Sequence, residues 1–124
     1  MKTLRTRSDL RAALGSMGAG VEVGLVPTMG ALHAGHLALL EAARAECDLV
    51  VASIFVNPTQ FGPGEDFETY PRDEKSDART AKAAGVDYLF VPPVKEMYPD
   101  GFQTWVEVER LSQGLEDEIG RAHV

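Results

Sequence analysis

Three short apolar runs, separated by segments with helical spacing, define the organisation of this chain. They are Val21–Val26, Leu49–Phe55 and Val86–Val91. Runs of this length, rich in β-branched and aromatic residues, are typical of strands that are buried on both faces of a parallel sheet. Proline has no N–H for a sheet ladder, so we expect the first strand to end at Pro27 and the third at Pro92.

Two segments between these runs predict helices. Ala34–Ala45 follows the first strand and places Leu37 and Leu40 on one helix face. Asp73–Ala84 is made of good helix formers and is followed by Gly85, a residue type that often lies just past a helix end. The chain therefore alternates strand, helix, strand, helix and strand.

This alternation predicts an α/β fold with a parallel sheet, flanking helices and right-handed crossovers. Ligands of such folds bind beyond the carboxyl ends of the strands. We also expect a helix that is capped by Ser8 and runs to about Leu14, and a short edge strand over Gln103–Val108. Complete doubly wound domains have about five or six strands, so a chain with fewer is expected to be incomplete.

Composition excludes several classes of protein. The chain has 124 residues, 44% hydrophobic and 25% charged, as in one small globular domain. No apolar run approaches the roughly 20 residues of a membrane-spanning helix, and the start lacks the apolar stretch of a secretory signal, so we expect a cytoplasmic protein. Cys47 is the only cysteine, which excludes an internal disulfide and, without a CxxC pair, structural zinc.

The acidic charge lies in the second half of the chain. The formal net charge is −7, whereas residues 1–61 contain as many acidic as basic side chains. No basic stripe is present, which argues against a nucleic-acid partner. An anionic ligand would be held locally, by backbone N–H groups, a helix N-terminus, histidines or single arginines. This favours a small phosphate-bearing ligand.

The richest cluster of polar groups follows the first predicted strand, in the sequence PTMGALHAGH over residues 27–36. His33 and His36 share a face if the helix begins near them, and Gly35 allows a ligand to approach the backbone. Together with the positive end of the helix dipole, they are suited to hold a phosphate chain during phosphoryl or nucleotidyl transfer.

Other interpretations of the histidines stay open. His33 could cap the helix while His36 packs under a loop. Zinc binding is disfavoured because the HExxH context is missing. The Walker sequence GxxxxGK[ST] and the dinucleotide fingerprint GxGxxG are also absent. Neither a P-loop kinase nor a dehydrogenase is therefore favoured.

The sequence PTMGALHAGH resembles the HxGH motif of the nucleotidylyltransferase superfamily. Further motifs narrow the resemblance: FVNPTQF over residues 55–61, Asp66, YPR over residues 70–72 and MYP over residues 97–99. In this order and spacing they are similar to those of the pantothenate synthetase family. The chain is identified as a member of that family over residues 1–116, which implies a Rossmann-like nucleotidylyltransferase sheet with flanking helices.

The resemblance implies ATP-dependent condensation of pantoate with β-alanine through a pantoyl adenylate, with release of pyrophosphate and AMP. His33 and His36 would be catalytic, His36 as proton donor, and Mg²⁺ would shield the triphosphate, with no protein ligand assigned to the metal. The implied ATP-binding residues are Met29, Gly30, Ala31, Leu32, His33, Ala34, Gly35 and His36. The implied contacts to pantoate and β-alanine are Gln60, Pro27, Met29, Val56, Asn57, Phe61 and Tyr70.

The resemblance ends near Glu116. Family members continue with lysine- and arginine-bearing motifs, so residues 1–117 are expected to form a truncated nucleotide-binding domain and residues 118–124 a non-native tail. We expect a homodimeric parent protein, and a fragment that is inactive and, with an open sheet edge, weakly folded. The alternatives are a short nucleotide-binding protein without catalysis and another HxGH nucleotidylyltransferase.

Overall fold

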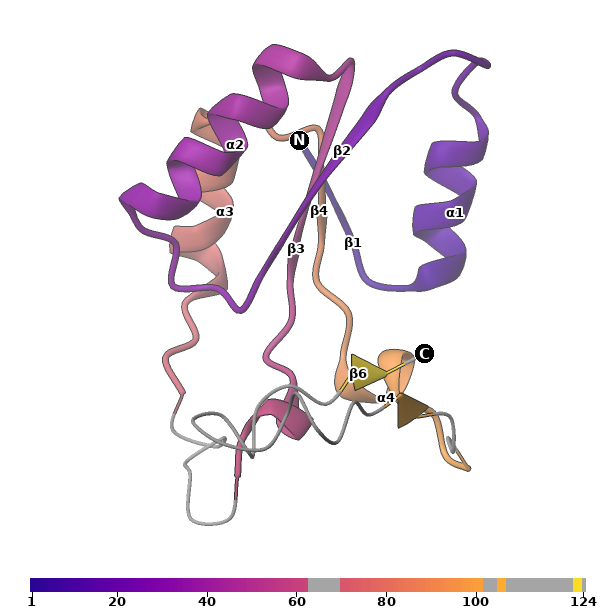
Figure 1. Cartoon of the computed structure of the whole chain (residues 1–124), viewed down its shortest axis with the longest axis vertical. Helices are drawn as coiled ribbons and strands as arrows, with labels where there is room; N and C mark the ends of the chain where they lie inside the picture. The colour runs from indigo at the N-terminus through magenta and orange to yellow at the C-terminus, as the bar shows by residue number, and fades with distance from the viewer. Residues whose placement is uncertain (63–69, 102–104, 107–121, 124) are drawn as a thin grey trace.

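A parallel sheet with helices on both faces forms the centre of the molecule. The computed structural model describes residues 1–62, 70–101, 105–106 and 122–123. The principal helices are α1 (Arg7–Gly15), α2 (Ala34–Glu46) and α3 (Glu74–Ala83). Figure 1 shows α2 and α3 together on one face of the sheet and α1 on the other. Within the described ranges no helix is long and apolar enough to cross a membrane.

The sheet has four strands in the order β1-β4-β3-β2, and all neighbours are parallel. The strands are β1 (Lys2–Leu4), β2 (Val23–Thr28), β3 (Leu49–Ile54) and β4 (Tyr88–Phe90). The three predicted strands and the α/β fold class are thus confirmed. β1 was not predicted, because three residues with only Leu4 buried are too few to give a periodic signal.

β2 continues through Pro27 to Thr28, so the prediction that it ends at the proline was wrong. Among the strands that the structure describes, β2 pairs with β3 alone. The carbonyl oxygen of Thr28 accepts a hydrogen bond from Phe55 N at 3.0 Å. Because successive residues of a strand point their backbone groups to opposite sides, the nitrogen of Pro27 faces the open edge, where no ladder bond is lost.

Side-chain caps set where the helices begin. α3 is capped by Asp73, and both α2 and α3 agree with the predicted segments to within one residue at each end. α1 is capped by Thr6, whose Oγ1 accepts from Asp9 N at 3.0 Å. The prediction of Ser8 as the cap was therefore wrong, because Ser8 already lies inside the helix.

Shorter elements follow the strands. They are the 3₁₀ helix η1 (Pro58–Gln60), α4 (Val94–Met97), β5 (Trp105–Val106) and β6 (Ala122–His123). β5 pairs antiparallel with β6 in a separate sheet, so the described part of the predicted strand Gln103–Val108 is not an edge of the main sheet. Its other residues, Asp66 and most of the tail over residues 118–124 lie outside the described ranges. The domain division stays a prediction.

The core lies on both faces of the sheet, as continuous apolar strands require. The larger cluster packs between the sheet and the helices α2 and α3, and consists of Val26, Leu40, Val50, Ala52, Ile54, Ala81, Val86 and Leu89. The smaller cluster lies on the α1 side and is formed by Leu4, Val51 and Phe90. β3 contributes to both clusters, because its successive side chains point to opposite faces.

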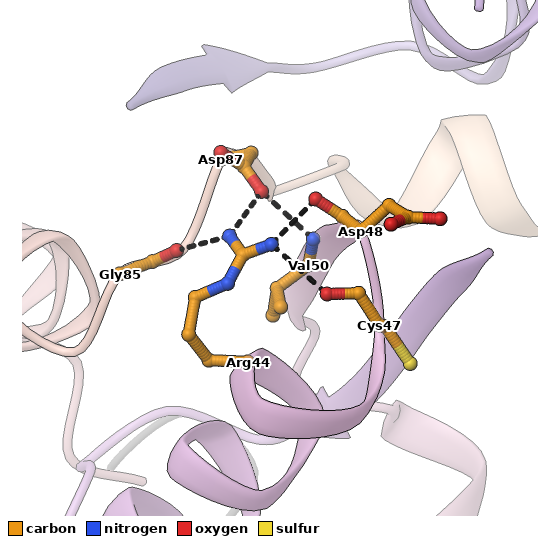
Figure 2. A network of polar contacts seen from close by, with 6 residues as sticks. All are labelled: Arg44, Cys47, Asp48, Val50, Gly85 and Asp87. Carbon is orange, nitrogen blue, oxygen red and sulfur yellow. Dashed lines mark hydrogen bonds and ion pairs between the residues drawn. The ribbon is translucent and has the colours of Figure 1, made fainter. Parts of the chain in front are cut away.

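Arg44 ties the last turn of α2 to the amino ends of β3 and β4. Figure 2 shows its guanidinium between two parts of the chain: the carbonyl oxygens of Cys47 and Asp48, which follow α2, and the turn before β4 with Gly85 and Asp87. Its Nη1 donates to the Asp87 carboxylate at 2.7 Å and to Gly85 O at 3.0 Å, and its Nη2 donates to Cys47 O and Asp48 O. Asp87 also accepts from Val50 N at 2.8 Å, so the network closes the end of the sheet opposite to its carboxyl edge.

Replacing Arg44 with methionine is expected to destabilise the fold. The substitution keeps most of the apolar stem, but the carbonyl oxygens lose the Arg44 donor and Asp87 keeps only the bond from Val50 N. We expect a loss of about 1–2 kcal/mol, because the ion pair is partly solvated. Denaturant unfolding measures this loss. Arg79→Met, at an exposed position of α3, is the matched control. Equal midpoints for the two variants would contradict a stabilising role for Arg44.

Candidate functional site

The carboxyl ends of the strands surround a cavity of about 860 Å³. It brings together many of the residues that the sequence singled out, from three separate segments of the chain. These are Pro27, Met29, Gly30, Ala31, His33, His36, Asn57, Gln60 and Tyr70. The cavity therefore lies where the α/β fold places ligands, and the two histidines share it with Asn57 and Gln60.

Other predicted site residues lie outside this lining. Leu32 packs against the larger core cluster. Ala34 and Gly35 are exposed residues of the first turn of α2. Val56 lines a second, smaller cavity, and Phe61 makes an edge-to-face ring contact with Tyr70 at 5.6 Å. Phe61 thus supports a residue of the lining instead of forming it.

The loop between β2 and α2 has an uncommon backbone. Gly30 and Ala31 have φ angles of 83° and 52°, so two consecutive residues are left-handed. Glycine adopts this conformation freely, but alanine does so at a cost of about 1 kcal/mol. A Cβ on Gly30 would also meet Asp77 Oδ2 at 3.0 Å. Glycine is required here for its φ angle and for the close approach of α3.

Side chains on both sides hold this loop. Thr28 Oγ1 accepts from Gly30 N at 3.1 Å and donates to Ser53 O at 2.9 Å. Asp77, from α3, accepts from Ala31 N and Leu32 N, each at 2.9 Å. Asp77 is 5% exposed and is the buried charged residue among those that the structure describes. The loop is therefore fixed before any ligand is present.

The rings of both histidines accept backbone N–H groups at the start of α2. His33 is the N-cap, and its Nδ1 accepts from Gly35 N at 3.0 Å. His36 Nδ1 accepts from His33 N at 3.1 Å, and the ring centroids are 4.0 Å apart. A neutral imidazole whose Nδ1 accepts a hydrogen bond carries its proton on Nε2. Both rings therefore have an Nε2–H donor free for a ligand in the cavity that they line.

This arrangement joins two interpretations that the sequence left open. His33 does cap the helix, yet it also lines the cavity, so capping and ligand contact use different nitrogens of the same ring. Burial lowers the pKa of His36, the neighbouring His33 lowers it further, and the charge of Asp77 opposes both effects. The neutral form of His36, with its single donor at Nε2, is thereby favoured.

The second part of the site follows β3. Asn57 Oδ1 accepts three hydrogen bonds: from Thr59 N at 3.0 Å, Thr59 Oγ1 at 2.6 Å and Tyr98 OH at 3.0 Å. These bonds occupy the carbonyl oxygen of the amide and orient it. The amide nitrogen of Asn57 is then the group that a ligand can use as a donor. Gln60, at the end of η1, is exposed in the same cavity.

Sequence reasoning missed several residues around the cavity. Asp77 lies in the segment that forms α3, where the sequence shows many charged residues and does not distinguish it from those that face solvent. Tyr98 was part of a family motif but was given no role, although its hydroxyl orients Asn57. The lining also includes Leu10, Phe90 and Met97, which come from α1, β4 and α4. The sequence indicates these three residues only indirectly, because they lie near the carboxyl end of a strand or on the apolar face of a helix.

A metal centre built by the protein is not found in the described part of the chain. There, no group of three or more histidine, cysteine or acidic side chains lies close enough to hold an ion. The one buried carboxylate near the loop, Asp77, already uses both oxygens as acceptors for backbone N–H groups. A cation at this site would therefore depend on oxygen atoms brought by the ligand.

Comparison with known proteins gives consistent results. Residues 2–124 match the family described as pantoate-beta-alanine ligase. The pantothenate synthetase of Bartonella henselae is 52% identical over 124 residues, 99% of this chain and 44% of that protein. That of Thermus thermophilus is 59% identical over 109 residues, 88% of this chain and 38% of that protein. The chain thus spans less than half the length of these curated relatives.

Solved structures share the fold. A crystal structure of pantothenate synthetase from Thermus thermophilus has a TM-score of 0.85 and 51% identity, covering 94% of this chain and 42% of that one. The pantoate-beta-alanine ligase from Francisella tularensis, complexed with beta-gamma ATP and beta-alanine, has a TM-score of 0.85 and 38% identity, covering 94% and 46%. These likenesses confirm the Rossmann-like nucleotidylyltransferase fold. The chain belongs to the pantoate-beta-alanine ligase family.

Proposed function

We propose that this chain provides the ATP-phosphate and pantoate part of a pantothenate synthetase site. The single observation that supports this most strongly is the pair of imidazoles at the start of α2, which accept amide N–H groups through Nδ1 and line one cavity. The polar amides of Asn57 and Gln60 lie across that cavity. The cavity thus combines hydrogen-bond donors for the phosphates of ATP with amides that can bind the acid substrate. Transfer of a nucleotidyl group to an acid requires both.

The reaction proceeds in two displacements. A carboxylate oxygen of pantoate attacks the α-phosphorus of ATP, the bond to the bridging oxygen breaks, and pyrophosphate leaves with that electron pair. The amine of β-alanine, after losing a proton, then attacks the acyl carbon of the pantoyl adenylate, and AMP leaves. In the first step negative charge develops on phosphate oxygens, where the N–H donors of His33 and His36 stabilise it. His36, which the resemblance assigns as proton donor, acts in this proposal as a hydrogen-bond donor through Nε2–H, because its neutral ring keeps that proton.

The acceptor end of the cavity has both polar and apolar groups. The amides of Asn57 and Gln60 donate to the carboxylate and hydroxyl oxygens of pantoate, and Gln60 later accepts from the ammonium group of β-alanine. Tyr70 adds a phenolic hydroxyl. Pro27 and Met29 line the apolar wall beside the methyl groups of pantoate. Val56, which lines the smaller cavity together with Met29, and Phe61, which contacts Tyr70, add to the apolar surroundings.

The charge of the triphosphate is only partly balanced by the described residues of the larger cavity. Among the described residues that line the larger cavity there is no lysine or arginine. The positive potential there comes from the first turn of α2 and from the histidine donors. Mg²⁺ held by phosphate oxygens would supply further charge neutralisation. We also propose a cytoplasmic location and a homodimeric parent protein, which follow from the family resemblance.

Removing the His36 donor is expected to weaken nucleotide binding. In titration calorimetry with a non-hydrolysable ATP analogue and Mg²⁺, His36→Ala should bind at least about tenfold more weakly than the unmodified chain, since hydrogen bonds to charged groups are worth this much. Glu41→Gln, on the exposed side of the same helix, should bind within about twofold of it. Pantoate should bind to the complex with the analogue. Unchanged affinity in His36→Ala would reject the proposed role of the histidine.

Protonation of His36 is expected to destabilise the fold. Its pKa lies below the ordinary value of 6.5 in the folded chain, so the unfolded chain binds more protons between the two values. The contribution of His36 to stability is therefore complete above about pH 6.5 and is lost as the pH falls through the lowered pKa. A proton on Nδ1 of His36 would also point at the backbone N–H of His33, from which Nδ1 accepts a hydrogen bond in the neutral ring.

Thermal unfolding of His36→Gln tests this sign. Glutamine at this position keeps an acceptor for the N-cap N–H but does not titrate. Between about pH 7.5 and pH 5 the unmodified chain should lose more thermal stability than the variant, because only the former protonates His36. The carboxylates are the same in both proteins, so their contribution cancels when the two pH profiles of thermal stability are subtracted. Parallel pH profiles would contradict the lowered pKa.

A further inference from the structure

Asp77 contacts the loop between β2 and α2 from the neighbouring helix α3. Its carboxylate lines a second cavity of about 210 Å³, which lies behind Met29 and Gly30, and it is not part of the larger cavity. The side chain is 5% exposed and comes from the first turn of α3. Asp77 is therefore not among the residues that line the larger cavity with the two histidines. It acts on that cavity through the backbone that it holds and through its charge, which raises the pKa of His36.

Both carboxylate oxygens are used on consecutive amides. Oδ2 accepts from Ala31 N and Oδ1 accepts from Leu32 N, each at 2.9 Å. Such bonds to an ionised acceptor are about twice as strong as neutral ones. An asparagine at this position would have one acceptor oxygen, and its NH₂ group would face the other amide. Only a carboxylate accepts from both N–H groups at once.

These two bonds fix the strained part of the loop. Ala31 has a φ of 52°, which a non-glycine residue holds only when its surroundings impose it. The bonds also turn the N–H groups of Ala31 and Leu32 toward α3 and away from the ligand cavity. The next residue is His33, the N-cap of α2. The direction in which the chain enters α2, and with it the position of both imidazole rings, is set at this point.

We propose that Asp77 is a positioning residue of the nucleotide site, whose carboxylate holds the Gly30–Leu32 backbone so that His33 and His36 present their Nε2–H groups to the phosphates of ATP. This proposal rests on the proposed function. It assigns phosphate contact to the imidazoles and not to the amides of Ala31 and Leu32, which are already bonded. The charge of Asp77 also acts on His36, where it raises a pKa that burial lowers.

The first test uses the unmodified chain. Amide hydrogen exchange followed by NMR should show the N–H groups of Ala31 and Leu32 protected, although they lie in a loop and Ala31 is exposed. Addition of MgATP should leave their exchange unchanged, because they do not bind phosphate. Exchange as fast as that of a free loop, or protection that appears only with MgATP, would overturn the proposal.

The second test compares three variants by titration with MgATP. Asp77→Asn should bind MgATP at least about tenfold more weakly, with faster exchange at Ala31 and Leu32. Val50→Ala removes core volume far from the loop and controls for lost stability, and Glu41→Gln controls for lost charge. Both should bind within about twofold of the unmodified chain. If Asp77→Asn binds as well as they do, or Val50→Ala binds as weakly as Asp77→Asn, the positioning role fails.

The outcomes separate this proposal from the proposed function. If the unmodified chain does not bind MgATP, the proposed function fails, while amide exchange at Ala31 and Leu32 still decides whether Asp77 holds the loop. If MgATP binds and depends on His36 but not on Asp77, the proposed function stands and the positioning role is rejected. If Asp77→Asn does not fold, the exchange measurement on the unmodified chain decides the matter.

Discussion

Hydrogen bonds from backbone amides to the rings of His33 and His36 connect the start of α2 to the candidate site. Each ring accepts an amide N–H through Nδ1, so each completes the first turn of α2 and keeps a donor at Nε2. The rest of the fold fixes where this turn lies. β2 ends at the carboxyl edge of the sheet, shortly before this turn begins. The Arg44 network holds the opposite end of α2. The geometry of the site is therefore a consequence of how the helix begins.

The fold could be predicted from periodicity because burial on both faces of a parallel sheet demands continuous apolar strands. Leu49–Phe55 and Ala34–Ala45 were recognised in this way, and the structure has β3 and α2 there. The failures came from local chemistry that depends on neighbours. Pro27 is tolerated within β2 because its nitrogen faces away from β3, and a sequence does not show on which side a strand is paired.

The candidate site was predictable where its residues are contiguous. The PTMGALHAGH segment contains the loop, the cap and both donors, and motif spacing located Asn57 and Gln60 beside them. Asp77 could not be found in this way, because it is 46 positions from Ala31 and its burial depends on how α3 packs against the loop. The same holds for Tyr98, whose partner Asn57 is 41 positions away. Long-range contacts that position functional groups require the folded structure.

The tautomeric state of the two histidines tests the connection between cap and site most directly. Long-range ¹H–¹⁵N NMR spectra of the chain near neutral pH distinguish a protonated from an unprotonated ring nitrogen. Capping by Nδ1 predicts that His33 and His36 both carry a proton on Nε2 and none on Nδ1. A proton on Nδ1 of either ring would mean that this ring does not cap α2. It would also remove the N–H donor on which the proposed contact with phosphate depends.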